Sequence, residues 1–364
     1  MANIRVCTRC VMNDASDQTI TFDEQGHCSY CTKALNELGT VYFPNEEGKR
    51  RLDAMLKKIK EENKDKPYDC IMGISGGLDS SYLAYLGYQW GLRILAVHID
   101  DGYDTEISKQ NIQKLCKAAH IELRTITPDA EQFNDLILAY MKAGVPNLAI
   151  PQDNILFAFL CDTVKKEGLK YFLSGGNFAL EGILQHDHVF NAMDTVNIRD
   201  IHRKFGTKGT DNLKFISSYQ KYLRIKRGTV ITLRPLNYID YNRDRAFREL
   251  KDFCGFEYYG SKHLENILTA FVQLYWFPKK FGVDKRTSHL SSMIVSGQMT
   301  REEALSKLAE PMFDEKTMSA YIAFIQSQLG ITSEEFKKIM EAPAREHHDF
   351  KTDKVASILR KVVK

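Results

Sequence analysis

The segment GISGGLDSS at residues 73–81 constrains the fold of this chain more than any other feature. It follows an apolar run at residues 69–74 that is typical of a buried strand, and it precedes a helical stretch at residues 80–90. A glycine-rich turn between a strand and a helix is the usual context of a phosphate-binding loop, because the backbone can approach an anion and the helix N-terminus offers unpaired N–H groups. A glycine turn capped by Asp79 is the alternative, and no lysine follows the glycines as in a Walker loop.

Strand and helix patterns alternate after this segment. We expect strands at residues 93–99, 121–126 and 170–173, and helices at residues 108–119, 134–143 and 154–168. This alternation indicates an α/β fold with a doubly wound parallel sheet, resembling the adenine nucleotide α-hydrolases. Ligands of such sheets bind at the carboxyl ends of the strands, so the loops after residues 74, 99 and 173 should converge.

The rest of the chain divides around this sheet. We expect a small module at residues 1–45, an α/β domain at residues 46–240 with an insertion at about 178–228, and a mostly helical region at residues 241–364 that serves a substrate or partner. A charged amphipathic helix at residues 46–66 would bridge the first two parts. Capping boxes beginning at Thr300 and Thr332 predict two helix starts in the last part.

Composition gives little reason to expect a nucleic-acid or membrane partner. Lysine and arginine number 50 against 47 aspartates and glutamates, so no global charge attracts the chain to an anionic polymer or surface. No apolar run approaches the roughly 20 residues of a membrane span, and we see no signal segment. We therefore expect a cytoplasmic protein whose eight cysteines are metal ligands or buried thiols.

Four cysteines form two pairs near the N-terminus. Cys7 and Cys10 make one C-x-x-C knuckle, and Cys28 and Cys31 make a second one 17 residues later. This spacing predicts a tetrahedral zinc site without an open position for substrate, so its role is structural. An iron site of the same geometry stays open, and free thiols or a redox pair are the remaining alternative.

The letters SGGLDS at residues 75–80 resemble the signature of the N-type ATP pyrophosphatases, which include asparagine, GMP and NAD synthetases and tRNA thiolases. The resemblance implies ATP and Mg²⁺, adenylation of an acceptor oxygen, and displacement of AMP by a nitrogen or sulfur nucleophile. It places the pyrophosphate and its magnesium on Ser75, Gly76, Gly77, Asp79 and Ser80.

Longer stretches are similar to the N-acetyl sugar amidotransferases: CTRCVM at residues 7–12, TFDE at residues 21–24, YYGSKH at residues 258–263 and PKKFGVDKR at residues 278–286. The resemblance implies conversion of an acetamido group on a bacterial surface sugar, a nucleotide-linked uronic acid or a nonulosonic acid, into an acetamidino group. No cysteine has the setting of a glutaminase nucleophile. The resemblance therefore implies a separate glutaminase, similar to the glutaminase and cyclase pair of imidazole glycerol phosphate synthase.

Further candidate ligands follow the expected strands. Around the nucleotide we expect Gly73, Ser81, His98, Asp100, Ser174, Gly175 and Asn177. The basic group at residues 279–286 is a solvated face by composition alone, but the resemblance favours Lys285 and Arg286 as catalytic groups beside Asp79. His186 and His188 fit an exposed loop or a substrate contact.

Two other functions remain possible from the sequence. A tRNA thiolase or related base-modifying enzyme would share the pyrophosphatase loop and a zinc module, but it would be expected to show a basic surface. It would also often carry a cysteine near residues 174–177, where this chain has Ser-Gly-Gly-Asn. A non-catalytic zinc-ribbon adaptor would be favoured by loss of Asp79 or of the loop serines, and these residues are present.

Overall fold

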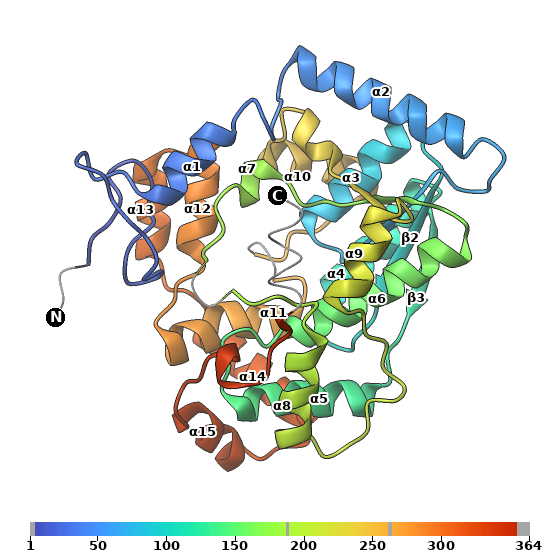
Figure 1. The fold of residues 1–364 in the computed structure, drawn as a ribbon. Helices are drawn as coiled ribbons and strands as arrows, with labels where there is room; N and C mark the ends of the chain where they lie inside the picture. Colours follow the sequence, from blue (N-terminus) through green and yellow to red (C-terminus); the bar gives the residue numbers. More distant parts are fainter. Residues whose placement is uncertain (1–3, 187–188, 261–263, 355–364) are drawn as a thin grey trace.

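A computed structural model describes residues 4–186, 189–260 and 264–354 of the chain. Its centre is a five-stranded sheet in the order β3-β2-β1-β4-β5, in which every neighbouring pair is parallel. The strands are β1 (Cys70–Gly73), β2 (Ile94–Ile99), β3 (Glu122–Ile126), β4 (Tyr171–Leu173) and β5 (Ile231–Leu233). The predicted doubly wound parallel sheet is therefore confirmed (Figure 1).

Burial along the strands explains the apolar runs. Strands β1 and β2 are buried over nearly their whole length, as expected for inner strands of a parallel sheet that is covered on both faces. The edge strand β3 reads ELRTI and has no fully buried residue. Charged side chains on an edge discourage pairing with another chain, so β3 ends the sheet on that side.

Helices cover both faces. On one face, Met72, Ile94 and Ala96 pack with side chains of α3 (Leu78–Gln89) and α4 (Glu106–Ala118). On the other face, Ile71, Leu95 and Val97 pack with α6 (Ile150–Lys166). Helices α2 (Glu46–Glu62) and α10 (Arg243–Cys254) extend the first layer, and α9 (Ser218–Lys226) lies outside α6 (Figure 1).

The predicted helices are present, with shifted boundaries. Helix α5 (Ala130–Ala143) begins four residues before the expected start because Asp129 caps it, accepting a hydrogen bond from Gln132 N. Pro151 in the first turn likewise lets α6 begin before residue 154. The expected insertion at about residues 178–228 contains α7 (Phe178–Glu181) and α8 (Thr195–Phe205) as well as α9.

The C-terminal region forms a helical layer that shares a core with α5 and α8, in which Trp276 and Phe271 are buried together with Tyr103 from the loop after β2. Its elements are α11 (Ile267–Phe271), η2 (Val272–Phe281), α12 (Arg286–Val295), α13 (Arg301–Ala309), α14 (Glu315–Leu329) and α15 (Ser333–Glu341), with two short turns elsewhere, η1 (Pro235–Tyr238) and η3 (His347–Asp349). The capping boxes at Thr300 and Thr332 are both formed. Element η2 is a π-helix, a form that is common at functional sites.

The N-terminal residues form a loop-rich module that ends in α1 (Ser29–Glu37) and lies beside α12 and α13 (Figure 1). Arg301 of α13 donates from Nη2 to the carbonyl of Cys7 at 3.0 Å, and Val11 N donates to Ser291 Oγ at 3.2 Å. The module is thus fastened to the helical layer. Over the described residues, the longest apolar helices fall short of what a membrane span requires.

Candidate functional site

A cavity of about 590 Å³ lies at the carboxyl edge of the sheet. Its floor includes Gly73 at the end of β1 and Ile74 after it, His98 and Ile99 at the end of β2, and Ser174 after β4. The chain runs outward from β1 to β3 and then returns to β4, so the strand order reverses between β1 and β4. Ligands of open α/β sheets bind at such a reversal, and the three loops predicted to converge do converge here.

The glycine-rich turn wraps the start of α3. Gly76 has φ of +74°, and a Cβ at this position would lie 2.4 Å from the carbonyl oxygen of Ser108. Gly77 is the N-cap of α3 and provides no side-chain acceptor for the first N–H groups of the helix. Leu78 N donates to the Tyr259 hydroxyl at 2.8 Å. The N–H groups that follow it, with the hydroxyls of Ser75 and Ser80, form a site suited to an anion.

A second small-residue loop closes on the first. A Cβ on Gly175 would lie 3.0 Å from Ser80 N, so a larger residue would force the two backbones apart by a few tenths of an ångström. Ser174 and Gly176 line the same cavity. The turn after β4 therefore forms the opposite side of the anion site.

Carboxylates surround this anion site. Asp79 accepts a hydrogen bond from the hydroxyl of Tyr241, which is buried. Glu265 lies against the glycine turn, since a Cβ on Gly77 would be 2.7 Å from its Oε1, and Glu181 lies against Gly176. Oxygen ligands next to a phosphate site are what Mg²⁺ prefers, so the residues present fit a magnesium-bound triphosphate.

His98 is held on two sides. Its Nδ1 lies 3.0 Å from the carbonyl of Ile74, and its Nε2 lies 3.0 Å from Asp104 Oδ2. Burial opposes protonation of this ring, but the hydrogen bond to Asp104 and its charge outweigh burial and raise the pKa of His98. Asn266 Nδ2 then bridges Asp104 to Asp101, whose pKa burial raises to about 6. This network fixes the end of β2 beside the cavity.

Not every predicted residue reaches the cavity wall. Gly73, Ser75, Gly77, Asp79, Ser80, His98, Ser174, Gly175 and Lys285 line the cavity, whereas Gly76, Ser81, Asp100, Asn177 and Arg286 are outside its lining. Gly76 instead lies against the Ser108 carbonyl of α4, where it allows the close packing of the turn. Asn177 caps α7 by accepting from Leu180 N at 2.9 Å, and the Asp100 carboxylate accepts from Gly102 N at 3.1 Å.

Lys285 and Arg286 point to different surroundings. The ammonium group of Lys285 lies 4.7 Å from the ring centre of Phe277 at the cavity wall. The guanidinium of Arg286 instead pairs with Asp284 at 2.9 Å and donates to the carbonyl of Glu310 after α13. Arg286 thus joins two helices, and we do not propose a catalytic role for it.

Two other predicted positions, Lys280 and His186, also have structural surroundings. Lys280 donates to the carbonyls of Ile339 and Ala342. The ring of His186 stacks on Tyr30, with 5.3 Å between ring centres. His188 lies outside the described residues, as do residues 261–263 of the YYGSKH stretch.

Several cavity residues were not predicted, among them Tyr259, Glu265, Arg243 and Asp153. Asp153 lies in the first turn of α6, and the surface it exposes faces the cavity. Within the described residues its carboxylate has no hydrogen-bond partner, and burial raises its pKa to about 6. A signal was available, because a helix that precedes a parallel strand begins at the carboxyl edge of the sheet.

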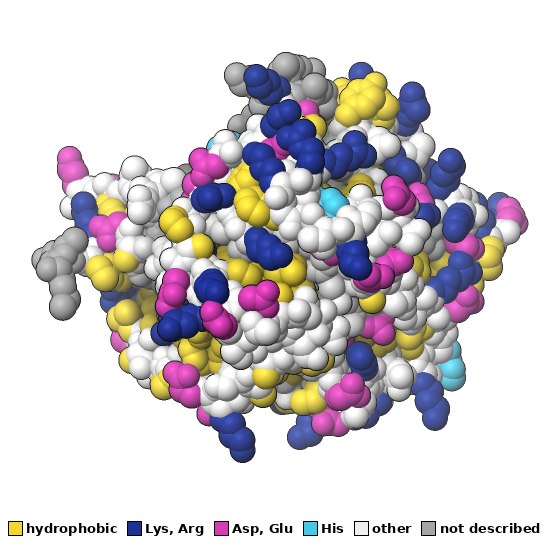
Figure 2. Space-filling view, turned by 90° about the horizontal axis from the view of Figure 1, so that it is seen from below, with side chains coloured by type: hydrophobic (Ala, Val, Ile, Leu, Met, Phe, Trp, Pro, Cys, Tyr) yellow, Lys and Arg dark blue, Asp and Glu magenta, His cyan; other side chains and the backbone are white. Residues whose placement is uncertain are grey.

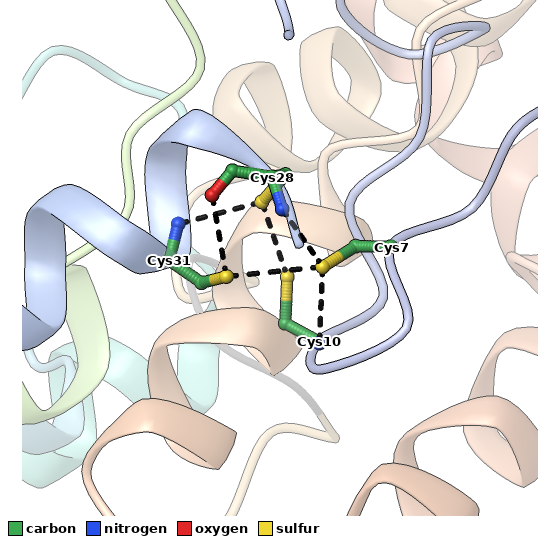
Figure 3. A group of neighbouring side chains, drawn as sticks. All are labelled: Cys7, Cys10, Cys28 and Cys31. Carbon is green, nitrogen blue, oxygen red and sulfur yellow. Dashed lines mark hydrogen bonds between the residues drawn. The ribbon is translucent and has the colours of Figure 1, made fainter. Parts of the chain in front are cut away.

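The four predicted metal ligands do come together. Figure 3 shows the sulfur atoms of Cys7, Cys10, Cys28 and Cys31 pointing toward one another from a loop and the start of α1. The Sγ atoms of Cys7 and Cys31 are 3.8 Å apart and those of Cys10 and Cys28 are 3.5 Å apart. Zinc–sulfur bonds of about 2.3 Å in a tetrahedron place sulfurs about 3.8 Å apart, so this donor set fits a structural zinc ion.

A comparison with protein-family models finds a match for the last part of the chain. Residues 265–363 match the family model for the C-terminal domain of WbpG-like LPS biosynthesis proteins. The matched residues include PKKFGVDKR at residues 278–286, one of the stretches on which the family resemblance rests, and the match bears out that resemblance. A comparison with curated proteins finds no match.

Solved structures similar to this chain include three synthetases. NMN synthetase from Francisella tularensis is 14% identical over 87% of this chain and 96% of that one, with a TM-score of 0.36. NAD⁺ synthetase from Burkholderia pseudomallei is 15% identical over 84% and 96%, with a TM-score of 0.39. NH₃-dependent NAD synthetase from Campylobacter jejuni is 14% identical over 57% and 93%, with a TM-score of 0.29. We therefore assign the fold from the strand order itself.

Proposed function

We propose that this protein adenylates the carbonyl oxygen of an acetamido group on a bacterial surface sugar, and that ammonia then displaces AMP to leave an acetamidino group. The observation that carries the proposal is a single cavity that joins the glycine turn at residues 73–81 to Lys285 of the WbpG-like region. A nucleotide and a sugar acceptor would thus share one space. The acceptor class is supported by the LPS biosynthesis match.

The nucleotide would bind with its β and γ phosphates at the start of α3. The N–H groups around Gly77 and the hydroxyls of Ser75 and Ser80 would hold these phosphates, and Asp79 would bind the magnesium ion. When bound, this ion neutralises the charge of the departing pyrophosphate. Apolar side chains suited to an adenine ring line the same cavity: Ile99, Leu156, Leu160 and Phe172.

The acceptor would approach from the side of η2 and Lys285. The amide oxygen attacks the α phosphorus, its bond to phosphorus forms and the bond to pyrophosphate breaks. Ammonia then attacks the carbon, AMP leaves with the C–O bond electrons, and a proton is lost from nitrogen. Lys285 would bind the carboxylate or phosphate of the acceptor, so the protein contributes mainly position and charge.

The cysteines argue for nitrogen rather than sulfur transfer. None of the described residues that line the cavity is a cysteine, so no thiol there can carry sulfur to a tRNA base. The face in Figure 2 carries both acidic and basic side chains, although Lys and Arg are denser toward its upper part. These observations favour the sugar acceptor over the tRNA thiolase alternative.

Ammonia would come from a separate glutaminase. Four cysteines of this chain form the metal group, and Cys70, Cys116 and Cys161 are buried in the sheet and its helices. Burial raises the pKa of the Cys70 and Cys116 thiols, which makes them poor nucleophiles. A partner resembling the glutaminase and cyclase subunits of imidazole glycerol phosphate synthase would supply the nitrogen.

The test is to incubate the pure protein with ATP, Mg²⁺, ammonium and a panel of N-acetylated nucleotide sugars and nonulosonic acids. Mass spectrometry should find AMP together with a sugar in which NH replaces oxygen. The Asp79→Ala protein should form no AMP, and Lys285→Ala should raise the acceptor KM, whereas Lys279→Ala serves as a neighbouring control. AMP formed only with tRNA would show that the acceptor class is wrong.

A further inference from the structure

The four-cysteine module contacts the segment that follows the cavity residues Leu180 and Glu181 through a buried carboxylate. Asp17 is fully buried, and its Oδ2 accepts hydrogen bonds from the Tyr30 hydroxyl at 2.5 Å and from His186 N at 3.0 Å. Its Oδ1 accepts from Thr19 N at 2.8 Å. The Tyr30 ring also stacks on the His186 ring. The backbone at residue 186 is therefore fixed to the metal module.

A second contact joins the module to the turn before α12. The carbonyl of Ser16 accepts from Gln185 Nε2 at 3.2 Å, and the hydroxyl of Ser16 accepts from Asp284 N at 3.4 Å. Gln185 Nε2 also lies 3.2 Å from Thr287 Oγ1. Ser16 and Gln185 thus connect three separate parts of the chain within the protein interior.

Both connected segments continue into the cavity. Leu180 and Glu181 come before the fixed segment at residues 183–186 and line the cavity, and Lys285 follows directly after Asp284. Helix α12 also fixes the segment at residues 183–186, because Ile183 N donates to Ser292 Oγ at 2.9 Å. The phosphate loop has other supports, since Leu78 N donates to the Tyr259 hydroxyl at 2.8 Å.

We propose that Asp17 is a positioning residue through which the metal module holds the acceptor side of the cavity, including Lys285. The acceptor side is the part of the cavity wall formed by Leu180, Glu181 and Lys285. Its name rests on the function proposed above, whereas the contacts of Asp17 are independent of that function. Asp17 presents two acceptor oxygens to hydroxyl and N–H donors. An amide in its place would turn an NH₂ group toward one of those donors and leave a buried donor unpaired. The segments at residues 180–186 and 284–287, which carry the wall residues Leu180, Glu181 and Lys285, then loosen while the nucleotide half stays formed.

The experiment compares Asp17→Asn with Asp23→Asn in the full-length, metal-loaded protein. Asp23 is a matched control, because its carboxylate is half exposed and contacts its own knuckle: it accepts from Gln25 N and His27 N and lies 3.4 Å from His27 Nδ1. Both variants should retain zinc. Three measurements are made on each: amide hydrogen exchange, the affinity for Mg²⁺ with a non-hydrolysable ATP analogue, and the acceptor KM.

For Asp17→Asn we expect exchange to rise about tenfold at residues 180–186 and 284–287, the size expected for losing one or two buried hydrogen bonds. We expect the acceptor KM to rise by a similar factor and the affinity for the ATP analogue to stay within about twofold. Asp23→Asn should match the wild type in all three. Unchanged exchange at those residues, or a loss of ATP affinity equal to the loss in acceptor KM, would overturn the proposal.

A milder variant covers the case in which Asp17→Asn does not fold. Tyr30→Phe keeps the ring that stacks on His186 but removes the hydroxyl that donates to Asp17 and accepts from His186 N at 2.9 Å. It should raise exchange in the same two segments and leave the phosphate loop at residues 75–81 unchanged. Exchange does not depend on the identity of the acceptor, so this result stands or fails separately from the sugar assay.

Discussion

The hydroxyl of Tyr241 donates a hydrogen bond to the carboxylate of Asp79, although the two residues lie 162 positions apart in the sequence. Tyr241 is buried just before α10, and its ring lies against Tyr82 of α3 at 5.7 Å between centres. Burial and the nearby charge of Asp79 raise the pKa of Tyr241 well above its ordinary value. The phenol therefore keeps its proton and sets the direction of the carboxylate that we assign to magnesium.

Replacing Tyr241 by Phe should slow AMP formation by about tenfold to a hundredfold, because a hydrogen bond to a charged group contributes about 1.5–3 kcal/mol. The fold should survive, since the ring still packs against Tyr82. The rate of ATP conversion to AMP and the melting temperature measure the two effects. Tyr140→Phe is the control, because that buried hydroxyl has no hydrogen-bond partner among the described residues. A full rate in Tyr241→Phe would show that the pair does not orient Asp79.

Gly76→Ala should abolish binding of Mg²⁺-ATP. The new Cβ would lie 2.4 Å from the Ser108 carbonyl, and a left-handed backbone costs a residue other than glycine about 1–2 kcal/mol. Gly39→Ala separates the two effects, since Gly39 has φ of +78° but nothing within 4 Å of the added atom. Calorimetry should therefore show normal nucleotide affinity for Gly39→Ala and none for Gly76→Ala. Equal affinities would mean that the turn does not hold the phosphates.

The sequence predicts the local parts of this site and misses the parts that arrive from a distance. The glycine turn is predictable because a strand, small residues and a helix follow one another within residues 69–90. Asn177 carries the same kind of signal, a polar residue after a strand, yet it caps the four-residue helix α7. Such a short helix leaves no periodic pattern, so a cap and a ligand look alike in the sequence.

Tertiary structure decides the remaining positions. Lys285 and Arg286 are adjacent in the sequence at the start of α12. In the fold, the Lys285 side chain lies over Phe277, whereas the Arg286 side chain pairs with Asp284. Tyr241 and Glu265 belong to no motif near the turn and reach it because the helical region folds back over the sheet. Charge and hydrogen-bonding capacity can be read from residue types, but direction depends on packing between distant elements.

Cys28→Ser should cost zinc and stability together. Cys28 supplies one sulfur, and that same sulfur accepts from Cys31 N at 3.4 Å as the cap of α1. Metal content should fall from about one zinc per chain toward zero, with a lower melting temperature, because folding of such modules is coupled to metal binding. Cys254→Ser, on α10, should change neither. A stable, zinc-free Cys28→Ser protein would contradict a structural role for the metal.

Asp153→Asn should make the protein more stable at neutral pH and less active. Burial raises the pKa of Asp153 to about 6, above the value of about 3.9 for an unfolded chain. Between these values the folded state binds more protons than the unfolded state, so stability falls as pH rises from about 4 to 6 and stays lower above that range. Asparagine does not ionise and avoids this cost. The gain in melting temperature should be full above pH 6 and should disappear as pH falls toward 4.

The matched control is Asp162→Asn on the same helix, which removes an ion pair with Lys214 at 2.6 Å on the surface and should not raise the melting temperature at any pH. The rate of AMP formation tells whether the carboxylate that lowers the melting temperature also contacts a ligand. A carboxylate that lines the cavity without a partner among the described residues is available to a ligand, so its removal should lower the rate of AMP formation. A more stable Asp153→Asn protein with an unchanged rate would show that the carboxylate meets no ligand. An unchanged melting temperature at pH 7.5 would show that the cavity walls do not raise the pKa of this carboxylate.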